Sequence, residues 1–480
     1  MEQSFVVAIL AAGQGTRFKS KRAKVLHSAG GRTLIEHAVR AAQALDPKQT
    51  FVIVGYQAEQ VMESLRNLKI SDLCFIHQTE QLGTGHALLC GRKELESAAP
   101  RMLVFYGDTP LLTTATLQKF LRSHLNSGAA ASVLTAQVAD PTGYGRIIRQ
   151  ANSRRDSDGS LAAIVEQKSA SAEQLRITEV NTGIYCFETK ALFAALEQVK
   201  PDPKKKEYYL TDVIGVLHQE GKKVQAYLAG DSREVMGINT RVELAQADAM
   251  LRERKAQELM LAGVTIIRPE TVLIDPDVEV GADTVIEPGV TLRGRTRIGE
   301  DCRIGSFSVI VDSELSNHVT VEPSCMIAQA RIGRHASIGP FARLRPGAEI
   351  GEEARVGNFV EVKQTRLGRA SKAQHLTYLG DAIIGDNVNI GAGTITCNYD
   401  GEKKNQTVIE DNVFIGSGTE LVAPVRVGRN SYVAAGSTVT EDVPPNSLTI
   451  ARSRQSTKPG WVQGRKKKRE QNKASSGPAD

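Results

Sequence analysis

The sequence predicts an α/β domain with a mostly parallel sheet, followed by a parallel β-helix. Residues 1–230 alternate short β-rich runs with longer amphipathic runs, which is typical of strands joined by crossover helices. From about residue 264, aliphatic residues recur every six positions and are usually followed by glycine, which is the period of a β-helix. A chain of 480 residues is also too long for one ordinary core.

The first domain, residues 1–238, is expected to be Rossmann-like. Its first strand is predicted at FVVAILAA (5–12), followed by a helix at TLIEHAVRAAQAL (33–45). A strand at TFVIVGY (50–56) and a helix at AEQVMESLRNL (58–68) repeat the alternation, and RMLVFYGD (101–108) supplies a further strand. Because strands and helices alternate in this way, the strands should lie parallel in one sheet.

Residues 239–263 are predicted to form one helix that links the two domains. Thr240 followed three residues later by Glu243 fits a capping box, in which each residue satisfies a free backbone N–H of the other. Gly263 stands where a helix would end.

Residues 264–455 are predicted to form the β-helix, in which each six-residue unit gives one short strand and a turn. Three units close a coil of 18 residues, and a sandwich with coincidental spacing is disfavoured because the period persists over so many units. The period shortens to five residues from Val362 to Leu367 and from Leu379 to Ile384, and TCNYDGEKKNQT (396–407) inserts a polar loop. Such interruptions are where binding sites are commonly built.

Charge and cysteine content narrow the classes of function. The net charge of +6 is mild, and RKKKR (465–469) lies in a C-terminal segment, 456–480, whose basic end has no apolar period. We expect a disordered, solvated tail there and favour it over a nucleic-acid-binding arm. Six widely spaced cysteines argue against a zinc site or a disulfide framework. With no basic signal region and no run of 18 apolar residues, we expect a cytoplasmic protein without a membrane partner.

The glycine-rich turn AILAAGQGTR (8–17) is a candidate phosphate cradle. Phe18 stands where the Rossmann fingerprint requires a third glycine, and the P-loop pattern is also missing. Backbone N–H groups at Gly13 and Gly15 could still approach anionic oxygens, with charge from Arg17 and Lys24. On these residues alone, a nucleotide site and a structural turn are equally well supported.

The motifs that accompany the turn carry a family resemblance. LAAGQGTR (10–17), QLGTGHA (81–87), YGD (106–108), GYGRI (143–147), IVEQK (164–168) and NTGIY (181–185) follow the order found in sugar-nucleotide pyrophosphorylases. The second half carries RLRPGAEIG (343–351), VGNFVEVK (356–363), HLTYLGD (375–381) and NIGAGTITCNYDG (389–401). Over about residues 5–461 the chain resembles the bacterial bifunctional N-acetylglucosamine-1-phosphate uridyltransferases and glucosamine-1-phosphate acetyltransferases. Phe18 and Ala23 depart from it, because the family commonly has Met and Pro there.

The resemblance implies a fold and two reactions. Glucosamine-1-phosphate would be acetylated by acetyl-CoA, and UTP would then transfer its uridylyl group to N-acetylglucosamine-1-phosphate with release of pyrophosphate, feeding peptidoglycan and lipopolysaccharide precursors. It further implies a left-handed β-helix and a homotrimer with acetyl sites between subunits.

For the uridylyl site, the resemblance implies that Arg17 and Lys24 are catalytic and that Asp108 and Asn239 hold Mg²⁺. Asp108 follows a buried strand, where open α/β sheets place ligands, although either metal residue could instead have a structural role, Asn239 as a helix N-cap. The implied nucleotide and sugar residues are Leu10, Ala11, Ala12, Gly13, Lys24, Gln78, Gly83, Thr84, Tyr106, Gly107, Asp108, Gly145, Glu166, Asn181 and Asn239.

For the acetyl site, the resemblance selects His375 as the base, with Glu361 orienting its imidazole. Histidine suits this role because it titrates near neutral pH. Arg345, Lys363, Tyr378 and Asn389 would hold the sugar phosphate, and Ala392, Asn398, Tyr399, Ser417, Ala435 and Arg452 would hold acetyl-CoA.

Two other functions stay open at this point. A pyrophosphorylase could use its β-helix only to trimerise, and a sensor or scaffold could retain a nucleotide-binding fold without catalysis. His375, Lys363 and the CNYDG segment (397–401) favour the bifunctional enzyme over the first alternative. Asp108 with Lys24 favours it over the second.

Overall fold

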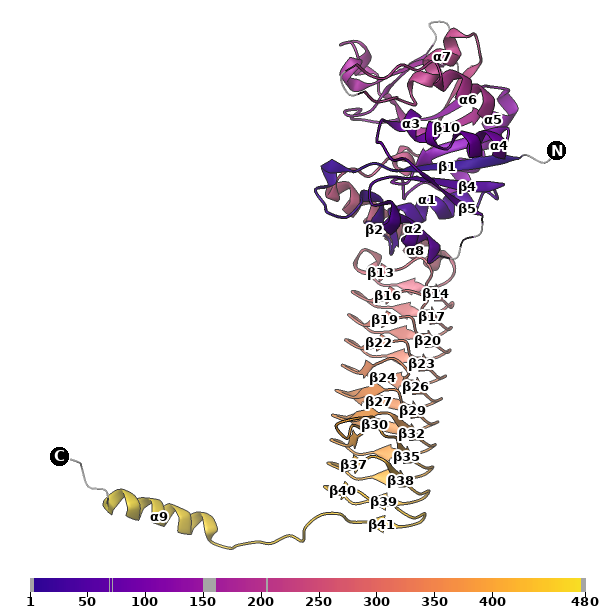
Figure 1. Cartoon of the computed structure of the whole chain (residues 1–480). Coiled ribbons are helices and arrows are strands. Elements are labelled where there is room, and N and C mark those ends of the chain that lie inside the picture. The colour runs from indigo at the N-terminus through magenta and orange to yellow at the C-terminus, as the bar shows by residue number, and fades with distance from the viewer. Residues whose placement is uncertain (1–3, 69, 71, 150–160, 204–205, 476–480) are drawn as a thin grey trace. The chain divides into compact units, whose positions relative to one another are not determined.

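The computed structural model describes residues 4–68, 70, 72–149, 161–203 and 206–475. Two compact units make up the chain. The first comprises Met1–Leu261 with Leu273–Val278, and the second comprises Ala262–Val272 with Glu279–Asp480. Figure 1 shows the α/β architecture of the first unit and the stacked short strands of the second.

One mixed sheet forms the centre of the first unit, in the order β11-β7-β10-β6-β1-β4-β5. β1 pairs in parallel with β4 and β6, and β4 in parallel with β5, whereas β10 is antiparallel to β6 and β7. Short strands β8 (Arg146–Arg149) and β9 (Leu161–Val165) extend the sheet beside β10. The strand bounds are β1 Phe5–Ala11, β4 Gln49–Val54, β5 Leu73–His77, β6 Arg101–Tyr106, β7 Ala131–Gln137, β10 Glu179–Glu188 and β11 Val224–Leu228.

Both faces of this sheet are covered, which explains the continuous apolar run of β1. Val6, Ala8 and Leu10 belong to one buried cluster. Phe5, Val7 and Ile9 belong to another. Successive side chains of a strand point to opposite faces, so an unbroken apolar run is needed when both faces are buried. The covering helices are α1 Leu34–Gln43, α2 Ala58–Arg66, α3 Thr84–Cys90, α4 Arg92–Ala98, α5 Thr114–Ser127, α6 Thr189–Leu196 and α7 Asp212–Gln219.

The helix expected over residues 239–263 is α8, Arg241–Leu261. Its capping box is formed, because the Glu243 amide donates to Thr240 Oγ1 at 3.2 Å and the Glu243 carboxylate accepts from the Thr240 amide at 2.9 Å. Gly263 follows the helix with φ +98°, a conformation that glycine adopts without strain. The contacts of α8 place it in the first unit, so it is an integral helix of that unit and not a separate segment.

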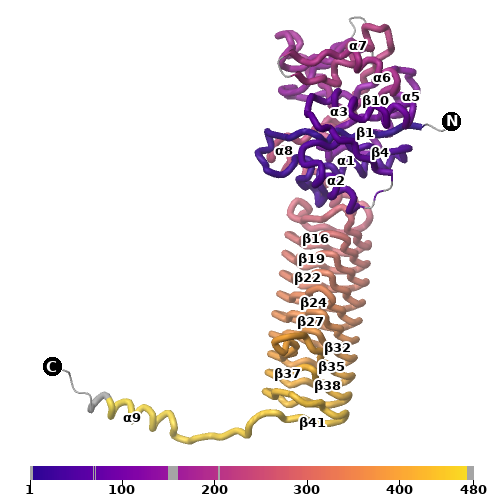
Figure 2. Tube along the Cα trace, viewed as in Figure 1, coloured from indigo at the N-terminus to yellow at the C-terminus, as the bar shows by residue number. Residues whose placement is uncertain are grey.

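The second unit is a parallel β-helix, seen in Figure 2 as a stack of coils. Its strands, most of two or three residues, lie in three sheets. One sheet runs from β12 (Thr265–Ile266) to β41 (Leu448–Thr449), a second reaches β40 (Thr438–Val439), and a third runs from β14 (Glu279–Val280) to β38 (Val425–Val427). The aliphatic residues of the six-residue period point inward, and Ile304 and Ile310 are fully buried. The coils approach so closely that a Cβ on Gly333 would lie 2.7 Å from the Glu352 amide nitrogen. Glycine at the turns is therefore a packing requirement.

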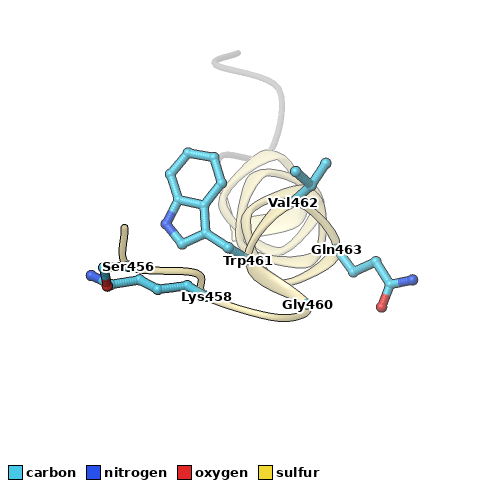
Figure 3. Close-up of a pocket in the computed structure, with 6 residues that line it drawn as sticks. All are labelled: Ser456, Lys458, Gly460, Trp461, Val462 and Gln463. Atoms are coloured by element: carbon cyan, nitrogen blue, oxygen red, sulfur yellow. The ribbon is translucent and has the colours of Figure 1, made fainter. Parts of the chain in front are cut away.

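The C-terminal segment corrects one prediction. Where we expected disorder after Gly464, the structure has helix α9 from Trp461 to Ser475. Residues 476–480 of the expected tail lie outside the described residues. Its many Lys, Arg and Gln residues have high intrinsic helix propensity, so a helix can form without an apolar face. The Arg465 guanidinium lies 5.1 Å from the centre of the Trp461 ring. A pocket lies where α9 begins, and all the residues that line it are exposed. Among them, Trp461, Val462 and Gln463 point to different sides of the helix (Figure 3).

All six cysteines are free thiols. None of the helices within the described residues combines the length and the apolar content that crossing a bilayer requires.

Two candidate active sites

The glycine-rich turn lies directly against the predicted basic residues. β1 ends at Ala11, and Gly15 follows with φ +64°, in the left-handed region that favours glycine. A Cβ on Gly15 would lie 2.7 Å from the Lys24 Cβ. The stem of Lys24 therefore runs along the turn, and any larger residue at position 15 would displace it.

Four predicted residues from three parts of the first unit meet at this turn. The Arg17 Nη2 donates to the Asn239 Oδ1 at 2.9 Å, and the Lys24 Nζ lies 3.3 Å from the same oxygen. Lys24 also forms an ion pair with the Asp108 carboxylate, which follows β6. Thr240, and not Asn239, caps α8, so the side-chain oxygen of Asn239 is free to contact the Arg17 and Lys24 cations.

The Asp108 and Asn239 oxygens fit a divalent cation. One positive group, the Lys24 ammonium, reaches both of them, so the two oxygens converge on a common point. A single carboxylate with an amide oxygen suits Mg²⁺, which takes few protein ligands and completes its shell with phosphate oxygens and water.

The two departures from the family pattern have structural consequences. Phe18 is 2% exposed and packs in a small cluster with Ala29, Leu34 and Ile238. The backbone N–H of Ala23, which a proline would lack, donates to Gln57 Oε1 at 2.6 Å. Both substitutions are therefore accommodated by contacts that hold the loop between Arg17 and Lys24.

The predicted uridine residues lie at the ends of β1 and β5. Gln78 follows β5, is 5% exposed and donates through Nε2 to the Gly83 carbonyl at 3.0 Å. Gly83 has φ +96° and precedes α3, and its missing side chain admits the backbone of Tyr208. Thr84 Oγ1 accepts from the Leu210 amide at 3.1 Å. Leu10, Ala11, Ala12 and Gly107 line the adjoining strand ends, where the Gly107 amide donates to the Leu10 carbonyl.

The predicted sugar residues also gather in one place. A Cβ on Gly145 would lie 3.5 Å from Glu166 Oε1 and 3.7 Å from the Asn181 Cβ. Asn181 is held by its own contacts, because its Nδ2 donates to Tyr185 Oη at 2.7 Å and its Oδ1 accepts from the Gly183 amide at 3.0 Å.

Tyr106 and Thr211 complete this sugar region. Burial, with a further contribution from Asp108 and Glu166, raises the pKa of Tyr106 well above its usual range, so its hydroxyl stays protonated. Thr211 Oγ1 donates to Glu166 Oε1 at 3.5 Å. Sequence reasoning missed Thr211, which could have been suspected only as the polar residue that precedes α7.

In the second unit, His375 stands at the end of β30 (Lys372–His375) with an exposed imidazole. Its Nδ1 lies 2.9 Å from Oδ1 of Asn358, the residue opposite it on β27 (Arg355–Asn358). Glu361, expected to orient this imidazole, forms an ion pair with Arg345 at 2.9 Å. Glu361 lies on β28 (Glu361–Lys363), in a different sheet from β30, and its role toward His375 stays a prediction. Sequence reasoning missed Asn358, although it lies within the quoted segment 356–363.

Three cations lie close together: Lys363 on β28, Lys404 on the polar loop, and Arg345. Lys363 Nζ is 3.7 Å from the Asp381 carboxylate. Lys404, from the inserted loop, lies so close to Lys363 that the side-chain contact with that lysine, together with charge repulsion, lowers the pKa of Lys404. Arg345 adds to this repulsion. Three neighbouring cations suit a dianion such as a phosphate. Lys404 was missed because a lysine in a polar loop gives no signal of its own.

The inserted loop is ordered by its own hydrogen bonds. The Asp400 carboxylate accepts from the backbone amides of Lys403 and Glu402 and from the Asn405 side chain. These bonds, that of Lys403 foremost, lower the pKa of Asp400 to about 2. At the base of the loop, Asn398 Nδ2 donates to Asp381 and to Tyr378 Oη. Tyr399 is exposed on the loop. The predicted residues Tyr378, Asn398 and Tyr399 are thus brought near the cations.

The other predicted acetyl-CoA residues follow a row along successive coils. The Gly418 amide donates to the Ala392 carbonyl at 2.7 Å, and the Gly436 amide donates to the Ser417 carbonyl at 2.8 Å. A Cβ on Gly416 would lie 2.4 Å from the Ala435 nitrogen, and one on Gly436 would lie 3.9 Å from the Arg452 Cδ. Asn389 lies on β33 (Asn389–Ile390), the strand that pairs with β30. Small residues leading to an arginine suit an extended anionic ligand.

Comparison with known proteins identifies the family to which the chain belongs. The family described as MobA-like NTP transferase domain matches residues 7–175, and the bacterial transferase hexapeptide family matches 277–312, 329–364 and 406–441. The bifunctional protein GlmU of Koribacter versatilis (strain Ellin345) is 49% identical over 98% of this chain and 99% of its own. The chain belongs to the GlmU family. A second GlmU, from Shouchella clausii (strain KSM-K16), is 49% identical over 95% of this chain and 98% of its own.

The GlmU match fits the two units described above. The NTP transferase region lies in the first unit, and all but the first residues of the hexapeptide regions lie in the second. The chain is a nucleotidyltransferase and an acetyltransferase in one polypeptide. A solved UDP-glucose pyrophosphorylase complexed with UDP-glucose is also similar, at 19% identity and a TM-score of 0.42, over 52% of this chain and 100% of that one.

Proposed function

We propose that the first unit transfers a uridylyl group from UTP to N-acetylglucosamine-1-phosphate and that the second acetylates the amine of glucosamine-1-phosphate. The observation that carries the nucleotidyl assignment is the convergence of Lys24, Arg17, Asp108 and Asn239 at the glycine turn. Oxygens and cations gathered around a backbone cradle suit a triphosphate better than any apolar ligand.

In the uridylyl reaction, a phosphate oxygen of the sugar phosphate attacks the α-phosphorus of UTP. The bond from that phosphorus to the bridging oxygen breaks, and pyrophosphate leaves with its electron pair. Arg17 and Lys24 stabilise the negative charge that develops on the transferred group and the leaving group. Glu166 and Asn181 orient the sugar, and Gln78 and Gly83 border the base.

Asp108 and Asn239 would hold Mg²⁺, which neutralises phosphate charge when bound. With substrate bound, the Lys24 ammonium contacts the substrate phosphates in place of Asp108, because one ammonium cannot pair strongly with both groups. The chain's own contribution is to place two oxygens and two cations around one point.

In the acetyl reaction, the amine of glucosamine-1-phosphate attacks the thioester carbonyl of acetyl-CoA. Nε2 of His375 accepts the proton that the amine loses, and the C–S bond breaks to release coenzyme A as its thiolate. Arg345, Lys363 and Lys404 hold the phosphate, supported by Tyr378 and Asn389. Ala392, Asn398, Tyr399, Ser417, Ala435 and Arg452 bind acetyl-CoA, within a homotrimer in which adjacent β-helices complete the site.

A two-step assay of the purified full chain tests this function. Glucosamine-1-phosphate with acetyl-CoA should give the N-acetylated sugar phosphate, and adding UTP with Mg²⁺ should give UDP-N-acetylglucosamine and pyrophosphate, each identified by mass. If N-acetylglucosamine-1-phosphate is uridylylated but the free amine is never acetylated, the β-helix serves assembly alone. If neither product forms, the scaffold alternative holds.

A further inference from the structure

The turn that follows β4, residues 55–57, contacts the loop between Arg17 and Lys24. The side chain of Gln57 makes two hydrogen bonds to this loop, donating from Nε2 to the Lys21 carbonyl at 2.8 Å and accepting at Oε1 from the Ala23 amide at 2.6 Å. The second bond lies one residue before Lys24. We infer that Gln57 is a positioning residue for nucleotidyl transfer, because it fixes the backbone from which Lys24 reaches Asp108.

The backbone of Gln57 supports this inference. Gln57 has φ +53° and ψ +40°, a left-handed conformation that is costly for a residue with a Cβ and that glycine would adopt freely. A glutamine in such a place needs a compensating interaction, and strained residues of this kind gather at functional sites. The two side-chain bonds to the loop are that interaction.

The same turn also contacts the opposite side of the phosphate cradle. The amide of Tyr56, the preceding residue, donates to the Ala12 carbonyl at 3.1 Å. A Cβ on Gly55 would lie 2.9 Å from the Ala12 Cβ, so the turn fits closely against the glycine-rich segment. Residues 55–57 therefore contact both the glycine-rich turn and the loop that leads to Lys24. They set the distance between the backbone N–H groups of that turn and the Lys24 ammonium.

The loop requires the bond that Gln57 supplies. Ala23 is 1% exposed, and a buried backbone N–H without a partner is unfavourable. Elsewhere the loop is held by the buried Phe18 ring and by a 3.0 Å hydrogen bond between Ser20 and His27. Those contacts hold the first part of the loop, whereas Gln57 holds the three residues that lead directly to Lys24.

The role of Gln57 rests on the proposed role of Lys24. A small displacement of a charge-stabilising group lowers the rate more than it lowers substrate binding. We expect Gln57→Ala to reduce the uridylyl kcat by about tenfold. The KM for N-acetylglucosamine-1-phosphate should change by less than about twofold, because Gly145, Glu166 and Asn181 lie on other elements.

The test compares three variants of the full chain. Gln57→Ala is matched by Gln60→Ala, the same substitution at an exposed position of α2. The third combines Gln57→Ala with Ala23→Pro, because Ala23 has φ −53°, which proline accepts, and a proline leaves no N–H to satisfy. Acetyl transfer and thermal unfolding, measured on every variant, report on folding.

The expected result is a tenfold loss of uridylyl kcat in Gln57→Ala, a wild-type rate in Gln60→Ala, and at least threefold recovery in the double variant, with acetyl transfer unchanged in all three. A wild-type kcat in Gln57→Ala overturns the inference, as does a loss that Ala23→Pro fails to recover. Lys24→Ala separates this failure from failure of the proposed function: if Lys24→Ala abolishes uridylyl transfer while Gln57→Ala does not lower it, the inference alone is wrong.

Discussion

Nδ1 of His375 lies 2.9 Å from Oδ1 of Asn358, which is the residue opposite it one coil earlier in the β-helix. An amide oxygen can only accept a hydrogen bond, so this contact places the imidazole proton on Nδ1. Nε2 is then left with its lone pair, as a general base requires. Asn358 therefore sets both the tautomer and the orientation of the proposed base.

Removing this hydrogen bond should slow acetyl transfer. In Asn358→Ala the imidazole can rotate and exchange tautomers, so we expect acetyl kcat to fall by roughly tenfold, within the range of general-base effects. Steady-state kinetics with glucosamine-1-phosphate and acetyl-CoA would measure it. Uridylyl transfer is the internal control and should be unchanged. An unaltered acetyl kcat would show that Asn358 is not needed to orient His375.

Asp108→Asn should lower uridylyl transfer and leave acetyl transfer unchanged. The substitution keeps the size of the side chain but removes the charge that pairs with Lys24 and would attract Mg²⁺. We expect uridylyl kcat/KM to fall by about a hundredfold at a fixed Mg²⁺ concentration, with acetyl transfer unchanged. A Mg²⁺ titration checks this prediction. A variant with the wild-type Mg²⁺ dependence would remove Asp108 from the metal site.

Lys404→Met should weaken binding of the sugar phosphate at the acetyl site. The variant loses one of the three neighbouring cations, and one charge-assisted hydrogen bond corresponds to about tenfold in affinity. The KM for glucosamine-1-phosphate should rise accordingly, with little change in kcat. Lys403→Met is the matched control, because Lys403 lies beside Lys404 in the same exposed loop. Equal effects in both variants would contradict a specific role for Lys404.

The stability of the first unit should fall in mild acid because of His124. This residue is 1% exposed on α5, and burial lowers its pKa to about 4, compared with about 6.5 in an unfolded chain. Between these values the unfolded chain binds the proton and the native state does not, so stability is lost as pH falls from about 6.5 to about 4. The expected loss is about 2 kcal/mol by pH 5.

Urea unfolding at pH 7.5 and pH 5, followed by circular dichroism, measures this loss. His124→Gln keeps a hydrogen-bonding side chain next to Ser132 Oγ but does not titrate. Its free energy of unfolding should therefore change less between the two pH values than that of the wild type. An equal change in the two proteins would exclude His124 as the source.

Much of the fold could be predicted because the signals were local and repeated. The six-residue period follows from inward aliphatic residues and turns too tight for a Cβ, as at Gly333. The helix start at Thr240 could be predicted because a capping box uses residues three apart. Residues 465–475 were wrongly predicted as disordered, because they carry helix propensity without the apolar period that the prediction used.

The candidate sites were predictable only where motifs carried them. Arg17, Lys24, Asp108 and Asn239 come together as the resemblance implies, although they are up to 222 residues apart in the chain. Asn358, Lys404 and Gln57 could not be found in this way, because each acts through a partner that only the folded chain brings near. The register of the coils places Asn358 opposite His375, whereas the role of Glu361 toward His375 stays a prediction.

The central claim is that two separate active sites share this chain, and His375→Ala tests it most directly. Acetyl transfer to glucosamine-1-phosphate should fall by about two orders of magnitude or more, the range expected for loss of a general base. Uridylyl transfer to N-acetylglucosamine-1-phosphate, measured on the same preparation, should remain at the wild-type rate because its residues lie in the other unit. A folded variant that keeps most of its acetyl activity, or that loses both activities together, would contradict the account.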